Sequence, residues 1–228
     1  MKFLLTCEHG GNEIPLEYQQ YFKKAGNVLN SHRGYDPGAL DLFCFLKDLA
    51  DDGHYSTTSR LLIELNRSLH HPKLFSEFTK NLSSEEKNDL VDRFYLPYRN
   101  SVEGLISKIL GKGGKVLHIS VHSFSPELDG NVRNTDIGLL FDPSKAEEKN
   151  YCEILKKQIL FTEPQFKVRY NYPYLGKADG FTTYLRKKFP DNYAGIELEI
   201  NQKFSVKNQM DAALKDRIKL ALKNSLKI

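Results

Sequence analysis

The 228-residue sequence contains no tryptophan, only two methionines and only three cysteines. Cys7, Cys44 and Cys152 lack the paired spacing of a cysteine metal site, and their odd number does not fit a disulfide framework. No run reaches the roughly 20 apolar residues of a membrane span. The apolar start, MKFLLTC, is too short for a signal peptide and lacks its cleavage site of small residues. We therefore expect a cytoplasmic protein with no membrane partner.

An excess of one charge is also missing. The 33 basic and 29 acidic residues give a net charge of +4, and the basic runs are short and interrupted by acids. A nucleic-acid-binding protein usually gathers its Lys and Arg residues on one stripe, so no nucleic-acid partner is expected. The sequence also has no Gly-x-Ser-x-Gly elbow, no phosphate-binding loop and no dinucleotide fingerprint, which excludes several classes of enzyme.

Apolar runs of strand length alternate with amphipathic segments of helix length along the chain. This alternation predicts one α/β domain over residues 1–228, with helices on both faces of a mostly parallel or mixed sheet. The expected strands are residues 2–7, 60–65, 115–121, 137–141, 166–170 and 194–200. The expected helices are residues 36–52 (capped by Asp36 and ended by Gly53), 83–110 (capped at Ser83 and bent near Pro97), 144–160, 181–188 and 208–226.

Polar, chemically capable side chains occur at the end of nearly every predicted strand. In open α/β sheets, ligands bind outside the carboxyl ends of the strands. We therefore expect these side chains to converge on one pocket. They are His9 after the first strand, Asn66 and Arg67 after the second, His122 after the third, Asn171 after residues 166–170, and Glu199 in the last strand.

His9 and His122 are the candidates for metal binding. Neutral imidazole is the commonest zinc ligand, and a catalytic zinc ion takes three protein ligands and a water molecule. Asp36 could supply the third ligand, although its place before Pro37 also suits a helix cap, and Glu13 is a rival. A lone loop histidine is more often structural, so the spacing leaves both a metal site and a structural role open.

Two carboxylates and one thiol are expected to stand outside the site. Glu64 and Glu197 alternate with apolar neighbours, which favours contact with a helix layer or pairing with basic residues. Cys7 and His9 flank Glu8 at a strand end. Because adjacent strand residues point to opposite faces, a thiol nucleophile activated by its neighbour is disfavoured.

Seven segments in a fixed order span about residues 3–204. They are CEHGGNEIP (7–15), YDPGALDL (35–42), SRLLIELNRS (59–68), HISVHSFSP (118–126), RNTDIGLL (133–140), YNYPY (170–174) and IELEINQ (196–202). This ordered set resembles the N-formylglutamate amidohydrolase family. The resemblance implies a phosphorylase/hydrolase-like (zinc-carboxypeptidase-like) fold of three layers, α/β/α. It also implies hydrolysis of N-formylglutamate to formate and glutamate.

The resemblance also implies roles for individual residues. His9, His122 and Asp36 would hold one zinc ion, and Glu199 would act as the general base. Asn66 and Arg67 match the family's Asn-Arg pair, which would bind the carboxylates of a small-molecule substrate. Beside these matches, we expect Arg133 to bind the substrate carboxylates with Arg67, and Asn171 to orient the substrate with Asn66.

Two departures from the expected patterns leave alternatives open. The family often has arginine where this chain has Asn201, which bears on the identity of the acyl-amino-acid substrate. Zinc carboxypeptidases use His-x-x-Glu, whereas Asn12 stands three residues after His9, so Asn12 and Glu13 remain alternatives to Asp36 as third ligand. A deacylase or carboxypeptidase of different specificity, or a non-catalytic small-molecule binding protein, remains an alternative function.

Overall fold

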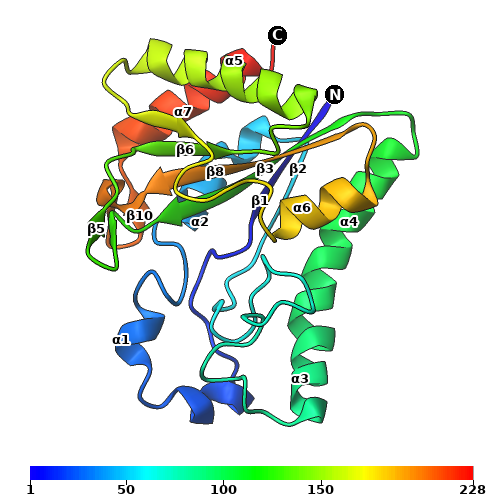
Figure 1. Cartoon of the computed structure of the whole chain (residues 1–228), viewed down its shortest axis with the longest axis vertical. Helices are drawn as coiled ribbons and strands as arrows, with labels where there is room; N and C mark the ends of the chain where they lie inside the picture. Colours follow the sequence, from blue (N-terminus) through cyan, green and yellow to red (C-terminus); the bar gives the residue numbers. More distant parts are fainter. Residues whose placement is uncertain (228) are drawn as a thin grey trace.

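A six-stranded sheet forms the centre of the structure, a computed structural model that describes residues 1–227 (Figure 1). Its strand order is β2-β1-β3-β8-β6-β7. The first four of these strands run parallel, whereas β6 pairs antiparallel with β8 and parallel with β7. The prediction of an α/β fold with a mixed sheet is therefore confirmed. The strands are β1 (Lys2–Cys7), β2 (Asp52–Tyr55), β3 (Val116–Phe124), β6 (Ile137–Leu140), β7 (Val168–Tyr170) and β8 (Tyr193–Asn201).

Helices cover both faces of this sheet, and α5 and α7 lie on the opposite side from α4 and α6 (Figure 1). The α-helices are α1 (Gly26–Leu29), α2 (Ala39–Leu46), α3 (Ser84–Leu90), α4 (Leu96–Leu110), α5 (Ala146–Thr162), α6 (Phe181–Lys188) and α7 (Ala212–Ser225). Shorter elements are η1 (Leu16–Phe22), η2 (Lys47–Leu49), the π-helical η3 (Val91–Tyr95), η4 (Gln202–Phe204), β4 (Glu127–Leu128), β5 (Asn131–Val132), β9 (Ser205–Val206) and β10 (Gln209–Met210). Among residues 1–227, no helix is both long and apolar enough to cross a membrane.

The alternation of side chains along each strand divides the apolar core into two parts. In β3, Leu117, Ile119 and Val121 pack against α2, α5 and α7 in one cluster. Val116 belongs to the second cluster, which contains apolar residues of α4 and α6. His118, Ser120 and His122 follow it on the same face of β3 and are polar, and this half-polar face of the sheet carries the site described below.

The segment 60–65, predicted as a strand, is a buried loop, and that prediction was wrong. Leu62 and Ile63 are fully buried, which explains the apolar run. The backbone finds its hydrogen-bond partners elsewhere: the Leu62 carbonyl accepts from Thr79 Oγ1 at 3.0 Å, and the Leu61 carbonyl accepts from the Ser76 hydroxyl. A short apolar run therefore indicated burial, while its backbone geometry depended on hydroxyl groups distant in the sequence.

The prediction of one helix over 36–52 was also wrong, because α2 is shorter and is followed by a strand. Gly38, with a φ of 81°, precedes α2, so Asp36 does not cap it through its side chain. Gly53 does not end a helix but lies inside β2, where an added Cβ would approach the ring of Phe43 at 3.1 Å. The capping box at Ser83 and Glu86 is confirmed, and the expected bend near Pro97 corresponds to the π-helical turn η3 just before it.

A buried histidine outside the cavity lies on the polar side of β3. The His118 ring contacts Thr6 Oγ1 at 2.8 Å and the Tyr193 hydroxyl at 2.7 Å. Burial lowers the pKa of His118 to about 4. Because its unfolded pKa is near 6.5, the folded state resists protonation, so stability falls as pH drops from 6.5 towards 4.

We expect the His118→Gln variant to show a smaller loss of stability in acid than the wild type. Between about pH 7.5 and about pH 5, neutral His118 should account for roughly 2 kcal/mol of the wild-type loss. Urea unfolding at the two pH values measures this difference, and His70→Gln, at an exposed histidine, is the control. Equal acid losses in wild type and His118→Gln would contradict the assignment.

Candidate active site

A cavity of about 300 Å³ opens at the carboxyl ends of β1, β3 and β8. This is the edge at which the sequence placed a pocket, and most of the predicted site residues line the cavity. The predicted residues in its wall are His9, Asp36, Asn66, Arg67, His122, Arg133 and Glu199.

Close backbone packing positions His9 directly after β1. At Gly11 an added Cβ would lie 2.5 Å from the Thr57 carbonyl oxygen, so a larger residue does not fit there. The backbone N–H of Asp36 donates to the His9 carbonyl at 2.9 Å, which brings the loop before α2 against the same turn. The His-Gly-Gly sequence thus lets three chain segments meet at the histidine.

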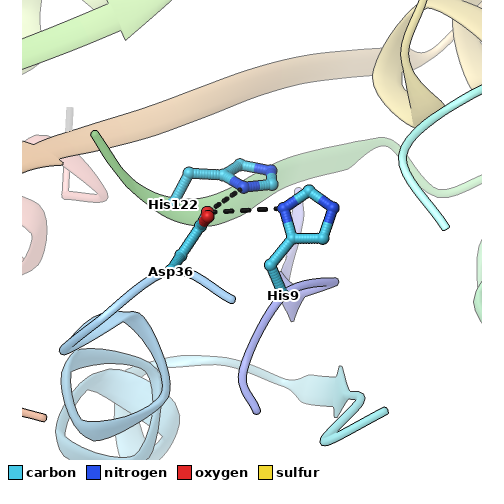
Figure 2. A group of neighbouring side chains, drawn as sticks. All are labelled: His9, Asp36 and His122. Carbon is cyan, nitrogen blue, oxygen red and sulfur yellow. Dashed lines mark hydrogen bonds and ion pairs between the residues drawn. The ribbon is translucent and has the colours of Figure 1, made fainter. Parts of the chain in front are cut away.

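His9, Asp36 and His122 point their side chains at one another from three separate elements (Figure 2). Asp36 Oδ2 lies 2.9 Å from His122 Nδ1 and 3.4 Å from His9 Nδ1. One ligand atom from each of the three residues lies within 4.8 Å of the others, and all three residues are buried. Asp36, rather than Asn12 or Glu13, is therefore the carboxylate that the fold brings to the two histidines.

The Nε2 atom of each histidine ring, on the side away from Asp36, contacts a carboxylate of its own. The Nε2 atom of His9 is hydrogen-bonded to Glu64, and the Nε2 atom of His122 lies 3.2 Å from Glu8 Oε2. When Nε2 carries the hydrogen, the Nδ1 atom that faces the shared point is free to act as a ligand. Carboxylate–histidine pairs of this kind orient metal-binding rings and increase their basicity.

These outer carboxylates are themselves fixed. Arg60 donates to Glu64 Oε2 through Nε at 2.8 Å and Nη2 at 2.6 Å, and to Asp36 Oδ1 at 3.2 Å. The Tyr98 hydroxyl donates to Glu8 at 2.8 Å, and the Ser120 hydroxyl donates to the same carboxylate. The rings of His9 and His122 therefore have little freedom to turn.

The electrostatics of the site favour ionised carboxylates. Burial would raise the pKa of the Asp36 carboxyl, but the two histidines outweigh it and hold that pKa well below its usual range. Burial likewise opposes ionisation of Glu64, whereas Arg60 and His9 lower its pKa. The neighbouring carboxylates in turn outweigh burial and raise the pKa values of the His9 and His122 rings. The ring nitrogens and Asp36 thus form a convergent set of imidazole and carboxylate donors. Zinc prefers this donor set, so the residues fit a zinc ion.

Glu199 lies beside this group on the neighbouring strand. Its backbone is in register with His122, since β8 pairs with β3, and its side chain is buried in the cavity wall. Burial raises the pKa of Glu199 to about 8, with a further contribution from Asp36. Its Oε2 atom is enclosed and has no hydrogen-bond partner among the described residues. A buried carboxyl group with a free oxygen and a raised pKa has the properties of a proton-transfer group.

The predicted substrate-binding residues fall into two groups. Asn66 and Arg67 lie beside the start of α6: Asn66 Oδ1 accepts from the Phe181 backbone N–H at 2.6 Å, and Arg67 Nη1 donates to the Asp179 carbonyl at 2.8 Å. Arg133 is grouped with Tyr174, whose hydroxyl lies 3.2 Å from Arg133 Nη1. Both arginines line the cavity, and neither forms an ion pair with the described part of the chain.

The side chains of Asn171 and Asn201 form hydrogen bonds with backbone groups and do not line the cavity. Asn171 Oδ1 accepts from the backbone N–H groups of Phe141 and Gly176, both at 3.0 Å, and Asn171 does not line the cavity. Its predicted role in orienting substrate is therefore not supported by its position. Asn201, where the family often has arginine, donates to the Arg133 carbonyl at 3.0 Å.

The residues that hold the His9 and His122 rings in place were not predicted from the sequence. Glu64 was expected to stand outside the site, Glu8 was expected only as one of several polar residues after the first strand, and no pattern pointed to Arg60 or Tyr98. The pairing of Glu64 with a basic residue was expected, and Arg60 is that residue. Glu8 offered one signal, a carboxylate beside a candidate ligand histidine at a strand end, but its contact with His122 comes from the neighbouring strand.

Three solved structures were compared with the whole chain. A crystal structure of a gene product from Agrobacterium tumefaciens overlaps with a TM-score of 0.81 and 25% identity, covering 99% of this chain and 90% of that one. An N-formylglutamate amidohydrolase from Ralstonia eutropha gives a TM-score of 0.73 and 14% identity, covering 100% and 94%. A metallo-carboxypeptidase from Burkholderia cenocepacia gives 0.43 and 11%, covering 99% and 57%.

No curated protein sequence matches the chain. The family model described as N-formylglutamate amidohydrolase matches residues 1–205. The match spans most of the sequence and includes His9, Asp36, His122 and Glu199. The chain therefore belongs to the N-formylglutamate amidohydrolase family of amide-bond hydrolases.

Proposed function

We propose that the protein is a zinc-dependent amidohydrolase that removes the acyl group from an N-acylated acidic amino acid, with N-formylglutamate as the reference substrate. One observation carries the proposal. The ligand atoms of His9, Asp36 and His122 converge beside Glu199, which has an enclosed oxygen without a partner. A catalytic zinc site of three protein ligands needs such a neighbour to move protons.

In this proposal each residue has one role. His9, Asp36 and His122 hold the ion, which when bound supplies Lewis-acid chemistry and makes a water molecule acidic near neutral pH. Glu199 accepts the proton of the attacking water and delivers it to the nitrogen that leaves. The positive charge of a divalent ion would favour the ionised form of Glu199 that this role requires.

The arginines of the cavity supply the specificity for an acidic substrate. Arg67 has one nitrogen fixed by backbone carbonyls, which leaves the rest of its guanidinium for a carboxylate. Arg133, also in the cavity wall, is held against Tyr174. Planar guanidinium groups bind carboxylates through paired hydrogen bonds, which fixes orientation as well as charge. Asn66 accepts from the Phe181 backbone N–H through Oδ1, and its amide nitrogen lies 3.5 Å from His122 Nε2, so it stands between the substrate pocket and the metal group.

Metal analysis and a formate-release assay test the proposal together. Protein purified without added metal should contain about one zinc ion per chain, and it should release formate from N-formyl-L-glutamate. A chelator should abolish that activity and added zinc should restore it. Activity that persists in metal-free protein would overturn the zinc mechanism.

A deacylase that prefers a larger acyl group is the second candidate, and the lining of the cavity favours it. Leu128 and Leu175 line the cavity beside Tyr174, and about half of the Leu175 side-chain surface is exposed. An apolar wall of this kind would accommodate carbon atoms that a formyl group lacks. Comparison of formyl-, acetyl- and succinyl-glutamate, beside a panel of C-terminal peptides, distinguishes the two candidates.

We expect the Glu64→Gln variant to bind zinc roughly 10- to 100-fold more weakly than the wild type, because loss of the carboxylate charge makes the His9 ring a weaker ligand. Competition with a fluorescent zinc chelator measures the affinity. The matched control is Glu13→Gln, since Glu13 is exposed and bonds only Thr57 through its side chain. Unchanged affinity in Glu64→Gln would show that Glu64 does not support the metal site.

A further inference from the structure

Glu197 is a second carboxylate in the cavity wall, and the roles proposed above do not use it. It stands two residues before Glu199 on β8, so both side chains leave the same face of the strand. The Glu197 side chain is buried, with 9% of its surface exposed. Two residues of strand separate their backbones by about 7 Å, which places two acidic groups along one wall.

The partners of Glu197 do not neutralise its charge. Its Oε1 atom accepts a hydrogen bond from the Thr182 hydroxyl at 2.9 Å. It forms no ion pair with any Lys, Arg or His in residues 1–227. A buried carboxylate without a cationic partner is costly, and it is normally retained where a ligand completes its surroundings.

Glu197 stands outside the metal group. That group, within the described chain, consists of His9, Asp36 and His122. Glu199 lies between Glu197 and the end of the strand, in register with His122, whereas Glu197 is in register with Ser120. The enclosed Oε2 of Glu199, on the same face of β8, has no hydrogen-bond partner among the described residues, which leaves a second acceptor in this wall for a ligand.

The surroundings of Glu197 belong to the arginine group at the start of α6. An added Cβ at Gly180 would lie 3.3 Å from Glu197 Oε1 and 3.2 Å from Asn66 Oδ1, so these groups meet at one point. Arg67 is bound to the neighbouring Asp179 carbonyl. A carboxylate and a guanidinium therefore both lie against the two residues, Asp179 and Gly180, that precede α6.

We propose that Glu197 binds the nitrogen of the scissile amide bond and holds it as the ammonium group of the departing amino acid. This inference rests on the proposed hydrolysis. Glu197 would accept the N–H of the substrate amide, while Arg67 binds the carboxylate of the same amino acid. The site is thereby specific for a product that carries both an amino and a carboxylate group on that side of the cavity.

The proton balance follows from the overall reaction. Water adds its oxygen to the carbonyl carbon, and its proton passes to Glu199. The C–N bond breaks as Glu199 returns that proton to the nitrogen. The carboxylic acid formed loses its remaining proton, and the amine gains it, so an acid anion and an ammonium ion leave. Glu197 takes no part in these proton transfers and contributes a hydrogen-bond acceptor for the nitrogen.

Ligand pairs that differ only at the nitrogen test the proposal. Zinc-loaded wild-type protein should bind L-glutamate more tightly than L-2-hydroxyglutarate, in which a hydroxyl replaces the ammonium. Calorimetry should show that Glu197→Gln weakens binding of glutamate roughly 10- to 100-fold but changes binding of hydroxyglutarate far less. Glu103→Gln is the charge-matched control, because Glu103 pairs with Lys188 and does not line the cavity.

Two outcomes would overturn the proposal: equal losses for both ligands in Glu197→Gln, or wild-type protein that does not prefer glutamate. If Glu197→Gln fails to fold, Glu197→Asp gives the same comparison, because its shorter side chain withdraws the carboxylate. Lack of turnover of N-formyl-L-glutamate by wild type would contradict the proposed function alone. The preference for glutamate and its dependence on Glu197 would still decide this inference.

Discussion

Replacement of Glu199 by glutamine is expected to reduce kcat by roughly 10²- to 10⁴-fold and to leave the metal content unchanged. Glutamine has nearly the same shape as glutamate but cannot accept the proton of the attacking water at neutral pH. Because Glu199 is not one of the three convergent ligand residues, metal binding should survive. Formate release and elemental analysis on the same preparation measure both quantities.

The size of the effect distinguishes proton transfer from a merely electrostatic role. The Glu199 carboxyl is buried, so its replacement by a neutral amide is not expected to destabilise the fold, and thermal unfolding checks this. The Glu13→Gln variant, at an exposed carboxylate near the same turn, should keep the wild-type rate. A wild-type rate in Glu199→Gln with full metal content would mean that another group moves the proton.

Side-chain periodicity predicted the buried strands β1, β3 and β8 and missed the polar edge strand β2. β1, β3 and β8 follow alternating or continuous apolar patterns, because each is covered on both faces. β2 was missed because Asp52–Tyr55 is polar and lies at the sheet edge, paired only with β1. Such a strand is held by backbone hydrogen bonds, which do not depend on the residue types, so its side chains show no strand pattern.

The residues of the site that lie at the ends of strands were predictable from the sequence. The rule for open α/β sheets placed His9, His122 and Glu199 at one edge, and the structure brings them there. Asp36 could be read as a helix cap or as a ligand. The backbone bond from Asp36 to the His9 carbonyl, a contact between distant loops, settles its position.

Contacts between separate elements account for what sequence reasoning missed. Glu64 lies in an apolar run that resembled a strand, yet the loop conformation turns its carboxylate to His9 and Arg60. Asn171 follows a strand as expected, but its φ of 50° lets its side chain bond nearby backbone groups. Both outcomes depend on local backbone conformation that the residue types do not specify.

Replacement of His122 by alanine is expected to abolish stoichiometric zinc binding and, with it, the hydrolysis. Loss of a supporting carboxylate costs roughly 10- to 100-fold in metal affinity, so loss of a ligand should cost more than about 100-fold. The variant also removes the histidine partner of Glu8 and leaves Asp36 with His9 alone of its two histidines. Zinc content after dialysis and chelator competition give the affinity.

A second histidine of the same cavity provides the control for this prediction. His32 lines the cavity but is not part of the convergent group, so His32→Ala should retain one zinc ion per chain. Should His122→Ala unfold, His9→Ala tests the same site from a different element, since His9 follows β1 rather than lying in β3. Full zinc occupancy in folded His9→Ala and His122→Ala would place the metal elsewhere in the protein.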